Sequence, residues 1–340
     1  MRRLGTFLAL ALVLLAARPA WADDPVESFY HGKTIQLLIG YSPGGGYDTY
    51  ARVLARHLGD HIPGHPSIVP QNMPGAGSLR ATNYLYNVAP KDGSAIATFA
   101  RGMAMEPLLN PAGTQYDARK FTWIGSVTNE VSVCAFWHTS GITSLKDMAE
   151  KSFTVGGTGS GSDTDIFPTV LRNMFHEKLK LVTGYPGGSD VVLALERGEI
   201  QGRCGWSWSS VLSRSKSLLD EKQIVVTVQL ALQKHEDLPD VPLILDLAQN
   251  ANEIAALKLI FSRQSVARPF AAPPDIPADR KAALRAAFDA TMKDPAFLDE
   301  AQKSDLEVRP VGGAEIDRLV AELYASPPEV VALAQAAIKE

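Results

Sequence analysis

Short apolar segments and longer segments with helical periodicity alternate along most of the chain. Apolar runs bounded by turn residues are typical of buried strands, and apolar side chains spaced three and four residues apart are typical of amphipathic helices. The expected strands cover residues 35–39, 67–71, 94–99, 153–155, 179–183, 200–206 and 224–228. The expected helices cover residues 48–59, 78–86, 165–177, 279–292 and 314–324. This alternation predicts an α/β protein with parallel sheets covered on both faces.

The alternation is interrupted where two strand-like runs, residues 121–127 and 131–137, follow one another without a helix between them. We interpret this interruption as the crossing of the chain into a second lobe, and the proline-rich stretch 269–277 as the return crossing. The sequence therefore predicts lobe I over residues 23–130, lobe II over residues 131–264, and a return to lobe I with the C-terminal helices over residues 265–340.

The N-terminus has the three parts of a secretory signal peptide. A basic Met1-Arg2-Arg3 precedes an apolar run over residues 4–17, and Ala20-Trp21-Ala22 fits the small-residue cleavage pattern. An uncleaved membrane anchor would need about 18 consecutive apolar residues, and Arg18-Pro19 ends the run too early. We therefore expect residues 1–22 to be a signal peptide that is cleaved after Ala22, and the mature protein to be periplasmic.

Charge and cysteine content narrow the function classes further. The formal net charge is −4 and we find no dense lysine or arginine run, so nucleic acid is not an expected partner. The chain has two cysteines, Cys134 and Cys204, which are too few for a zinc site on their own. In an exported chain such a pair is more often a disulfide than two free thiols.

A glycine-rich loop, Tyr41-Ser42-Pro43-Gly44-Gly45-Gly46-Tyr47-Asp48, joins the first expected strand to the first expected helix. Glycines let backbone N–H groups converge on a ligand, and the helix directs the positive end of its dipole at the same point, which favours an anion. The alternative is a sharp turn with no ligand. Glycine-rich loops also follow the strands at residues 67–71, 153–155 and 179–183. Loops at the carboxyl ends of strands in two lobes predict a ligand cleft between them.

Five features occur in the order and spacing of a known family. They are the signal peptide, the strand followed by Pro43-Gly44-Gly45 and Asp48, the Asn72-Met73-Pro74-Gly75-Ala76-Gly77 loop, Ala89-Pro90-Lys91-Asp92-Gly93 before a strand, and Tyr185-Pro186-Gly187-Gly188 before a helix that ends in Gly198-Glu199. Together they resemble the periplasmic solute-binding receptors of tripartite tricarboxylate transporters, the Bug family. The resemblance extends over nearly the whole mature chain.

The resemblance implies a type II periplasmic binding protein fold, in which two doubly wound lobes are joined by a hinge with a ligand cleft between them. It implies a monomeric, non-enzymatic receptor without cofactor or metal, which delivers a small organic carboxylate to the membrane components of a tripartite tricarboxylate-type transporter. The residues that the resemblance assigns to the ligand are Ser42, Gly45, Gly46, Asp48, Gly75, Ala76 and Gly77 of lobe I, and Gly159, Ser160, Gly161 and Asp163 of lobe II. Tyr41, Tyr47 and Gln201 depart from the usual family pattern.

Arg101 and four aromatic residues are candidates for side-chain contacts with the ligand. Arg101 follows the expected strand 94–99, so it can reach the cleft and pair with a carboxylate, or it can be a surface arginine in a loop. Tyr41, Tyr47, Tyr185 and Trp206 lie in or beside glycine loops and are expected to line the cleft, with ordinary core packing as the alternative. With Arg101 as the only expected cation, the sequence predicts a carboxylate on an aromatic or flat apolar body rather than citrate.

Other chemistry finds weaker support. Neither Gly44-Gly45-Gly46 nor Gly75-Ala76-Gly77 completes a dinucleotide-binding pattern, and the segment 205–209 lacks the final glycine of a hydrolase nucleophile turn. His57, His61 and His65 are four residues apart, but glycine and proline interrupt their helix, so a solvated helix end is expected rather than a metal site. Asp163 and Asp165 are expected at a helix start rather than as an acid/base pair. The remaining alternative to a receptor is an exported enzyme or sensor subunit with the same fold.

Overall fold

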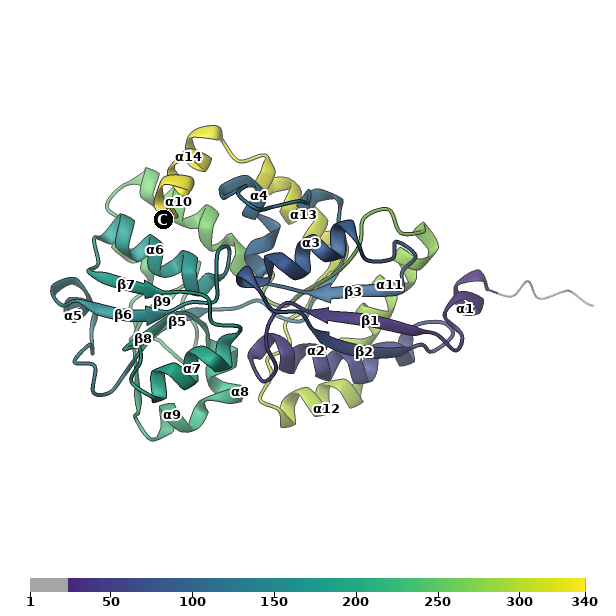
Figure 1. Cartoon of the computed structure of the whole chain (residues 1–340), viewed down its shortest axis with the longest axis horizontal. Helices are drawn as coiled ribbons and strands as arrows, with labels where there is room; N and C mark the ends of the chain where they lie inside the picture. Colours follow the sequence, from purple (N-terminus) through teal and green to yellow (C-terminus); the bar gives the residue numbers. More distant parts are fainter. Residues whose placement is uncertain (1–23, 340) are drawn as a thin grey trace, which may run out of the picture.

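The computed structural model describes residues 24–339, so the expected signal peptide and its cleavage site lie outside the described residues. Figure 1 shows two α/β lobes side by side, each built around its own sheet. Within residues 24–339, no helix is both long and apolar enough to cross a membrane. The predicted two-lobe α/β fold is confirmed.

Lobe I contains a sheet in which six of the described strands pair in the order β11-β4-β10-β3-β1-β2. The strands are β1 (Thr34–Ile39), β2 (Ser67–Asn72), β3 (Ala95–Thr98), β4 (Thr122–Ser126), β10 (Pro269–Ala272) and β11 (Val311–Gly312). The first three strands are parallel, with Leu37 beside Pro70 on one side and beside Ile96 on the other. Strand β10 runs antiparallel to β3 and β4, and β11 runs antiparallel to β4.

Helices cover both faces of this sheet because its central strands are apolar on both sides. Leu37 and Leu38 point to opposite faces and belong to two different buried clusters. The lobe I helices are α1 (Pro25–Tyr30), α2 (Gly46–His57), α3 (Leu79–Asn87), α4 (Glu106–Leu109), α11 (Ala278–Thr291), α12 (Pro295–Lys303) and α13 (Gly313–Tyr324). Tyr50 of α2 and Phe288 of α11 pack on the face of Leu37, whereas Val320 of α13 packs on the face of Leu38.

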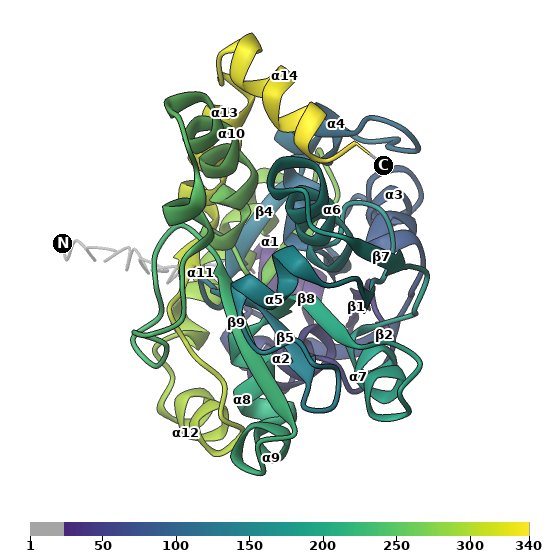
Figure 2. The same ribbon diagram turned by 90° about the vertical axis from the view of Figure 1, so that its left-hand side faces the viewer.

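Lobe II contains a second sheet, in which five described strands pair in the order β7-β6-β8-β5-β9. The strands are β5 (Ser132–Trp137), β6 (Phe153–Gly156), β7 (Leu179–Val182), β8 (Gly202–Ser207) and β9 (Ile224–Leu230). The helices are α5 (Leu145–Glu150), α6 (Asp163–Phe175), α7 (Gly188–Glu196), α8 (Trp208–Arg214), α9 (Lys216–Asp220), α10 (Ala251–Phe261) and α14 (Pro328–Ala337). A disulfide with an S–S distance of 1.99 Å joins Cys134 of β5 to Cys204 of the neighbouring β8. Figure 2 views this lobe from its end.

Two features differ from the sequence-based expectations. Both sheets are mixed rather than purely parallel, because β5 and β9 run antiparallel to their neighbours in lobe II, as β10 and β11 do in lobe I. Residues 265–340 were expected to return to lobe I, but their last helix, α14, packs against α10 and α6 of lobe II. Its residues Ala334, Ala337 and Ile338 are buried in the same cluster as Phe167 and Leu257. The end of the chain therefore returns to lobe II.

Candidate functional site

A small cavity of about 50 Å³ lies between the two lobes at the carboxyl ends of their parallel strands. Lobe I lines it with Tyr41, Gly45, Gly46, Tyr47, Ala100, Arg101 and Arg268. Lobe II lines it with Thr158, Ser162, Asp163, Thr164, Gly188, Arg203, Gly205, Ser207 and Ser210. The cavity is therefore an interlobe site, which we call the cleft cavity.

Three helices begin at the cleft cavity. Gly45 is the N-cap of α2, Ser162 is the N-cap of α6, and Gly188 is the first residue of α7. The first N–H groups of a helix have no partner within the helix, and its dipole places partial positive charge there. Gly46 has no room for a side chain, because a Cβ would lie 3.1 Å from Nη2 of Arg268 and would overlap Ser210. Glycine thus lets the start of α2 approach lobe II closely.

The glycine loops of the two lobes touch each other around the cavity. Ser42 Oγ donates to Asp190 Oδ2 at 2.6 Å, and Ser189 Oγ donates to Pro43 O at 3.1 Å. Gly77 N donates to Thr158 O at 3.0 Å. Gly77 has φ +59°, and a Cβ on it would lie 2.5 Å from the carbonyl oxygen of Gly159. The loops of lobe I therefore close directly onto the backbone of lobe II.

Arg101 lies at the wall of the cavity rather than on the surface. It begins the short 3-10 helix η3 (Arg101–Ala104) after β3 and is 3% exposed. Its Nε donates to Asp163 Oδ2, and its Nη2 donates to Ser132 Oγ at 3.1 Å and to Ser207 Oγ at 2.9 Å. Its Nη1 has no hydrogen-bond partner within residues 24–339. Arg101 therefore bridges the lobes and keeps one free donor.

Two further arginines line the cavity, and the sequence analysis missed both. Arg268, immediately before β10, is 1% exposed; its Nη2 donates to Ser209 Oγ and Ser210 Oγ, both at 3.0 Å, and lies 3.4 Å from Glu130 Oε2. Arg203 of β8 is 9% exposed, and its Nη1 donates to Gly188 O at 3.1 Å. The expectation that Arg101 would be the only cation near the ligand is therefore wrong.

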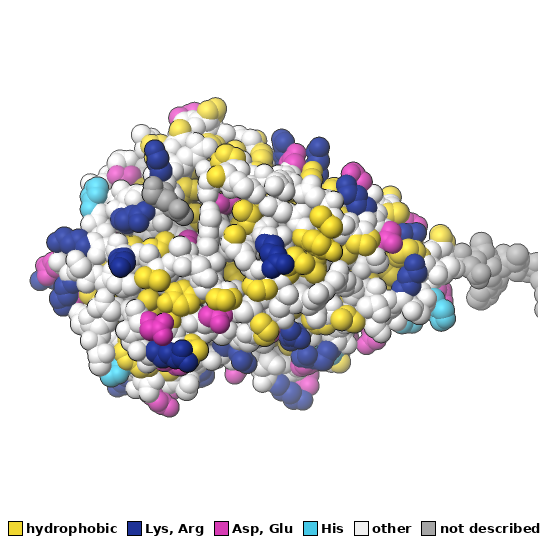
Figure 3. All heavy atoms as spheres, in the orientation of Figure 1, with side chains coloured by type: hydrophobic (Ala, Val, Ile, Leu, Met, Phe, Trp, Pro, Cys, Tyr) yellow, Lys and Arg dark blue, Asp and Glu magenta, His cyan; other side chains and the backbone are white. Residues whose placement is uncertain are grey.

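Burial makes the charge of Arg203 unfavourable. Removal from water and, to a smaller extent, the nearby positive charge of Arg268 lower the pKa of Arg203 to about 9, although Tyr41 opposes this shift. An arginine still carries its charge at neutral pH. On the face shown in Figure 3, basic and acidic side chains are interspersed, so the positive charge of the cleft cavity is not part of a basic area on that face.

The four candidate aromatic residues divide into two pairs. Tyr41 and Tyr47 line the cavity and stack on each other with ring centroids 4.8 Å apart, and the hydroxyl of Tyr47 accepts from Arg101 N at 3.0 Å. Trp206 and Tyr185 do not line it. Trp206 is buried with its ring 4.8 Å from the guanidinium carbon of Arg203, and it lines an adjoining pocket of about 250 Å³. Tyr185 packs against the apolar cluster of lobe II.

The other predicted ligand residues surround the cavity without lining it. Asp48 accepts from Gly44 N at 2.9 Å and from Asn72 Nδ2 at 2.8 Å, which fixes the first glycine loop. In the lobe II loop, Ser160 Oγ accepts from Asn110 Nδ2 at 2.9 Å. The predicted residues outside the cavity lining are Ser42, Asp48, Gly75, Ala76, Gly77, Gly159, Ser160, Gly161, Tyr185 and Trp206. The glycine loops thus shape and close the cavity around a smaller set of contact residues.

Asp163 and Asp165 lie in the first turn of α6 and have separate partners. Asp163 lines the cavity and pairs with Arg101, whereas Asp165 Oδ2 accepts from Gly159 N at 2.8 Å and from Ser162 Oγ at 3.0 Å. The histidines at the end of α2 also have partners, since His57 lies 2.7 Å from Glu300 and His61 lies 2.9 Å from Asp294. Within the described residues, no group of three or more His, Cys, Asp or Glu could hold a metal ion.

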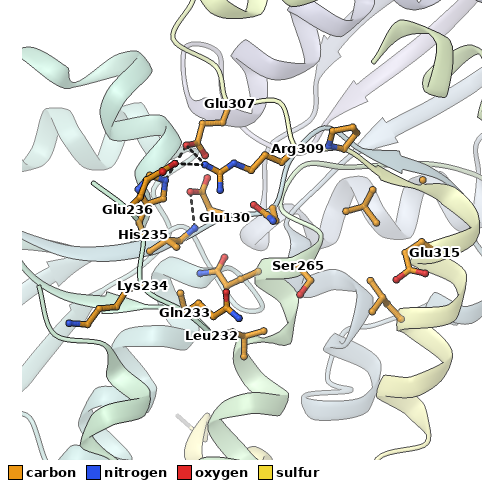
Figure 4. Close-up of a pocket in the computed structure, with 18 residues that line it drawn as sticks. Glu130, Leu232, Gln233, Lys234, His235, Glu236, Ser265, Glu307, Arg309 and Glu315 are labelled. Atoms are coloured by element: carbon orange, nitrogen blue, oxygen red, sulfur yellow. Dashed lines mark hydrogen bonds and ion pairs between the residues drawn. The ribbon is translucent and has the colours of Figure 1, made fainter. Parts of the chain in front are cut away.

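A second, larger pocket of about 730 Å³ lies where the chain crosses between the lobes, and we call it the hinge pocket (Figure 4). His235 Nε2 lies 3.1 Å from Glu307 Oε1, and Arg309 Nη2 lies 2.9 Å from Glu236 and 3.7 Å from Glu307. The hydrogen bond to Glu307 raises the pKa of His235, although burial opposes this shift. The charged groups of this network therefore compensate one another.

No family model matches the chain. Among curated proteins, the UPF0065 protein in the tcbD-tcbE intergenic region of Pseudomonas sp. strain P51 is 24% identical over 253 residues, which cover 73% of this chain and 71% of that protein. Protein BugT of Bordetella pertussis is 40% identical over 80 residues, which cover 24% of this chain and 22% of BugT.

Solved structures share the two-lobe fold over most of the chain. The periplasmic binding protein BugD is 18% identical with a TM-score of 0.74, over 91% of this chain and 99% of BugD. MatC from Rhodopseudomonas palustris, with bound malate, is 19% identical with a TM-score of 0.71, over 90% of this chain and 99% of MatC. The R. palustris protein Rpa4515, with adipate, is 18% identical with a TM-score of 0.69, over 89% of this chain and 97% of that protein. The sequence relatives thus confirm the resemblance to the Bug family (UPF0065) of periplasmic solute-binding proteins, and the solved structures confirm the two-lobe fold.

Proposed function

We propose that the protein captures a small organic carboxylate in the cleft cavity and delivers it to the membrane components of a tripartite tricarboxylate-type transporter. The observation that carries this proposal is the convergence of three buried arginines and three helix N-termini on one cavity between the lobes. Guanidinium groups and helix N-termini both favour a negatively charged group with several acceptor oxygens. A carboxylate meets that description.

The ligands of the related structures support a small carboxylate but differ from one another. MatC was solved with malate and Rpa4515 with adipate, and both ligands are dicarboxylates. The aromatic acid favoured by the sequence loses its main argument, because Arg203 and Arg268 add positive charge, and Trp206 and Tyr185 do not line the cavity. We therefore expect an aliphatic carboxylate to bind more tightly than benzoate.

Capture requires the lobes to move. A cavity of about 50 Å³ has room for roughly three to five water molecules, which is less than a four-carbon diacid needs. Ser42–Asp190 and Gly77–Thr158 are contacts across the cleft, so they must separate before a ligand enters. Opening about the crossings between β4 and β5 and between β9 and β10 would separate these contacts while each lobe keeps its own sheet.

Calorimetry and thermal unfolding test the binding step. The purified mature protein would be titrated with malate, adipate, citrate and benzoate, and a ligand at about 100 times its dissociation constant should stabilise the folded state by about 2.7 kcal/mol. We expect malate or adipate to bind and to be recovered chemically unchanged. If none of the four acids binds or raises the melting temperature, the proposed ligand class is wrong.

Delivery and export need separate tests. Deleting the gene should abolish uptake of the radiolabelled ligand by the source cells, and normal uptake in the deletion strain would contradict the transport role. The mass of the periplasmic protein should correspond to a chain that begins at Asp23, since we propose cleavage after Ala22. Light scattering coupled to gel filtration should give the mass of a monomer, and a dimer mass would contradict the proposed monomeric state.

A further inference from the structure

The three arginines of the cleft cavity differ in how their charges are compensated. Arg101 pairs with Asp163, and Arg268 lies 3.4 Å from the buried carboxylate of Glu130. Arg203 has no carboxylate at ion-pair distance among residues 24–339. Its contacts are the carbonyl oxygen of Gly188 at 3.1 Å and the ring of Trp206 at 4.8 Å. Arg203 therefore carries the uncompensated charge of the cavity.

The unpaired charge of Arg203 destabilises the folded protein, and the ring of Trp206 compensates it only in part. A buried ion without a partner destabilises a folded protein strongly, whereas the face of a tryptophan ring offsets only part of that effect. Arg203 is 9% exposed, and Arg268 adds a second positive charge nearby. A negatively charged ligand group beside Arg203 would remove this penalty, so the ligand-free cavity favours an anion at that position.

The geometry of Arg203 leaves one edge of its guanidinium group available. Nη1 donates to Gly188, but neither Nε nor Nη2 has a hydrogen-bond partner among the described residues. The Nε and Nη2 groups form parallel donors that match the two oxygens of a carboxylate. Gly188 makes this arrangement possible, because a Cβ at that position would lie 2.7 Å from Nη2 of Arg203.

Arg203 and the first glycine loop reach the cavity from different lobes. Arg203 projects from β8 of lobe II, whereas Gly45 and Gly46 begin α2 of lobe I. The start of α2 favours one anionic group without any charged side chain. A ligand held between the lobes can thus present one carboxylate to the N-terminus of α2 and a second carboxylate to Arg203.

We propose that Arg203 is the specificity-determining residue of the cleft and that it selects compact dicarboxylates over monocarboxylates of the same chain length. This inference rests on the proposed carboxylate-binding function and adds the requirement for a second anionic group. The loop of lobe I holds the carboxylate common to both ligand types, and Arg203 binds the carboxylate that only the diacid carries.

The test compares matched acids on matched variants. Calorimetric titrations would use succinate against butyrate and adipate against hexanoate, on the wild-type protein, on Arg203→Gln and on Arg203→Lys. Arg197→Gln is the control, because Arg197 is exposed and does not line the cleft cavity. For at least one pair we expect the wild type and the control to prefer the diacid by about 10- to 100-fold, the range expected for a charged hydrogen-bonded contact.

Arg203→Gln should reduce diacid affinity to that of the matched monoacid and leave monoacid affinity nearly unchanged. Arg203→Lys keeps the charge but loses the paired donors, so it should recover part of the preference. Without ligand, Arg203→Gln should unfold at the same temperature as the wild type or higher, because it removes an uncompensated buried charge. If Arg203 had a structural role instead, Arg203→Gln would lower the unfolding temperature and weaken the binding of diacid and monoacid equally.

The outcomes separate the two proposals. A wild-type protein that binds diacids, with an unchanged diacid preference in Arg203→Gln, overturns the role of Arg203 and leaves the receptor function standing. Equal wild-type affinity for diacid and monoacid has the same consequence. A wild-type protein that binds none of these acids and none of the acids in the broader screen overturns both.

Discussion

The cleft cavity and the hinge pocket differ in the way their charges are compensated. The hinge pocket is larger, about 730 Å³ against about 50 Å³, but its arginine, Arg309, has carboxylates at 2.9 and 3.7 Å. The cleft cavity holds three buried guanidinium groups close to two partner carboxylates, Asp163 and Glu130. Incomplete compensation of buried charge, rather than volume, is therefore the reason we propose the cleft cavity as the ligand site.

Glu130 connects the two regions. It lines the hinge pocket, yet its side chain is buried, Oε2 accepts from Ser209 Oγ, and Arg268 of the cleft cavity lies 3.4 Å away. The two pockets are thus separated by the ion pair between Arg268, which precedes β10 of lobe I, and Glu130, which lies in the crossing segment after β4. Breaking this pair should affect the protein more than breaking any pair on the open side of the hinge pocket.

The largest expected effect is that of Glu130→Gln on stability. This substitution leaves the buried charge of Arg268 without a partner, which should lower the free energy of unfolding by about 3–5 kcal/mol in urea denaturation. The control is Glu236→Gln, because the ion pair of Glu236 with Arg309 is largely exposed and should contribute less than about 1 kcal/mol. Similar losses in the two variants would contradict the distinction between the pockets.

A loss of stability of similar size is expected when the disulfide is removed. Cys134 and Cys204 are 70 residues apart in sequence, and closing a loop of this length is worth about 4 kcal/mol in the chain-entropy model. Neither cysteine lines the cleft cavity or the hinge pocket. The double variant Cys134→Ser/Cys204→Ser should therefore unfold at lower urea concentration while its folded form keeps its ligand affinity. A large loss of affinity would show that the disulfide also positions Arg203.

The features that the sequence predicted correctly are local. The loop at Gly45 and Gly46 was recognisable because a strand, a glycine run and a helix follow one another, and the structure has β1 and α2 in those places. The crossing near residue 130 was recognisable because two strands lack a helix between them. Strand direction was not recognisable, since an apolar run looks the same in a parallel and in an antiparallel pair.

The features that the sequence missed depend on contacts between distant segments. Arg203 lies in an apolar strand and reaches the cleft cavity only because β8 meets the start of α7, where Gly188 leaves room for its guanidinium group. Arg268 precedes Pro269 at the return crossing, and Glu130 pairs with it from 138 residues away in sequence. The apolar face of helix α14 can be recognised in the sequence, but the sequence does not show against which lobe that face packs. An arginine within an apolar strand was the available signal for Arg203.

A third prediction concerns closure of the cleft. A Cβ on Gly77 would lie 2.5 Å from the Gly159 oxygen of the opposite lobe, so Gly77→Ala should disfavour the closed arrangement through this contact and weaken ligand binding by about 10-fold, which corresponds to about 1.4 kcal/mol. Gly75→Ala is the matched control in the same loop. Gly75 also has a positive φ, +141°, but its nearest neighbour would be Arg80 of the same lobe at 3.3 Å. If both variants bind equally weakly, backbone strain alone explains the loss.

The smallest expected effect is a pH dependence that belongs to the hinge pocket. The groups facing His235 are Glu307, Asp237 and Arg309, and the hydrogen bond to Glu307 raises its pKa above the ordinary 6.5. A raised pKa in the folded state means that protonated His235 stabilises the fold fully below about pH 6.5, and that this contribution is lost as the pH rises through the folded-state pKa.

The free energy of unfolding of the wild type should therefore fall more steeply above pH 6.5 than that of His235→Gln, whereas the exposed His31→Gln should follow the wild type. Diacid affinity should change little over the same pH range in all three proteins, because the guanidinium groups of the cleft cavity stay charged there. Parallel stability curves for the wild type and His235→Gln would show that the His235–Glu307 contact does not couple the lobes. A pH-dependent affinity that disappears in His235→Gln would instead show that the hinge pocket controls the cleft cavity, and the two regions could no longer be treated as independent.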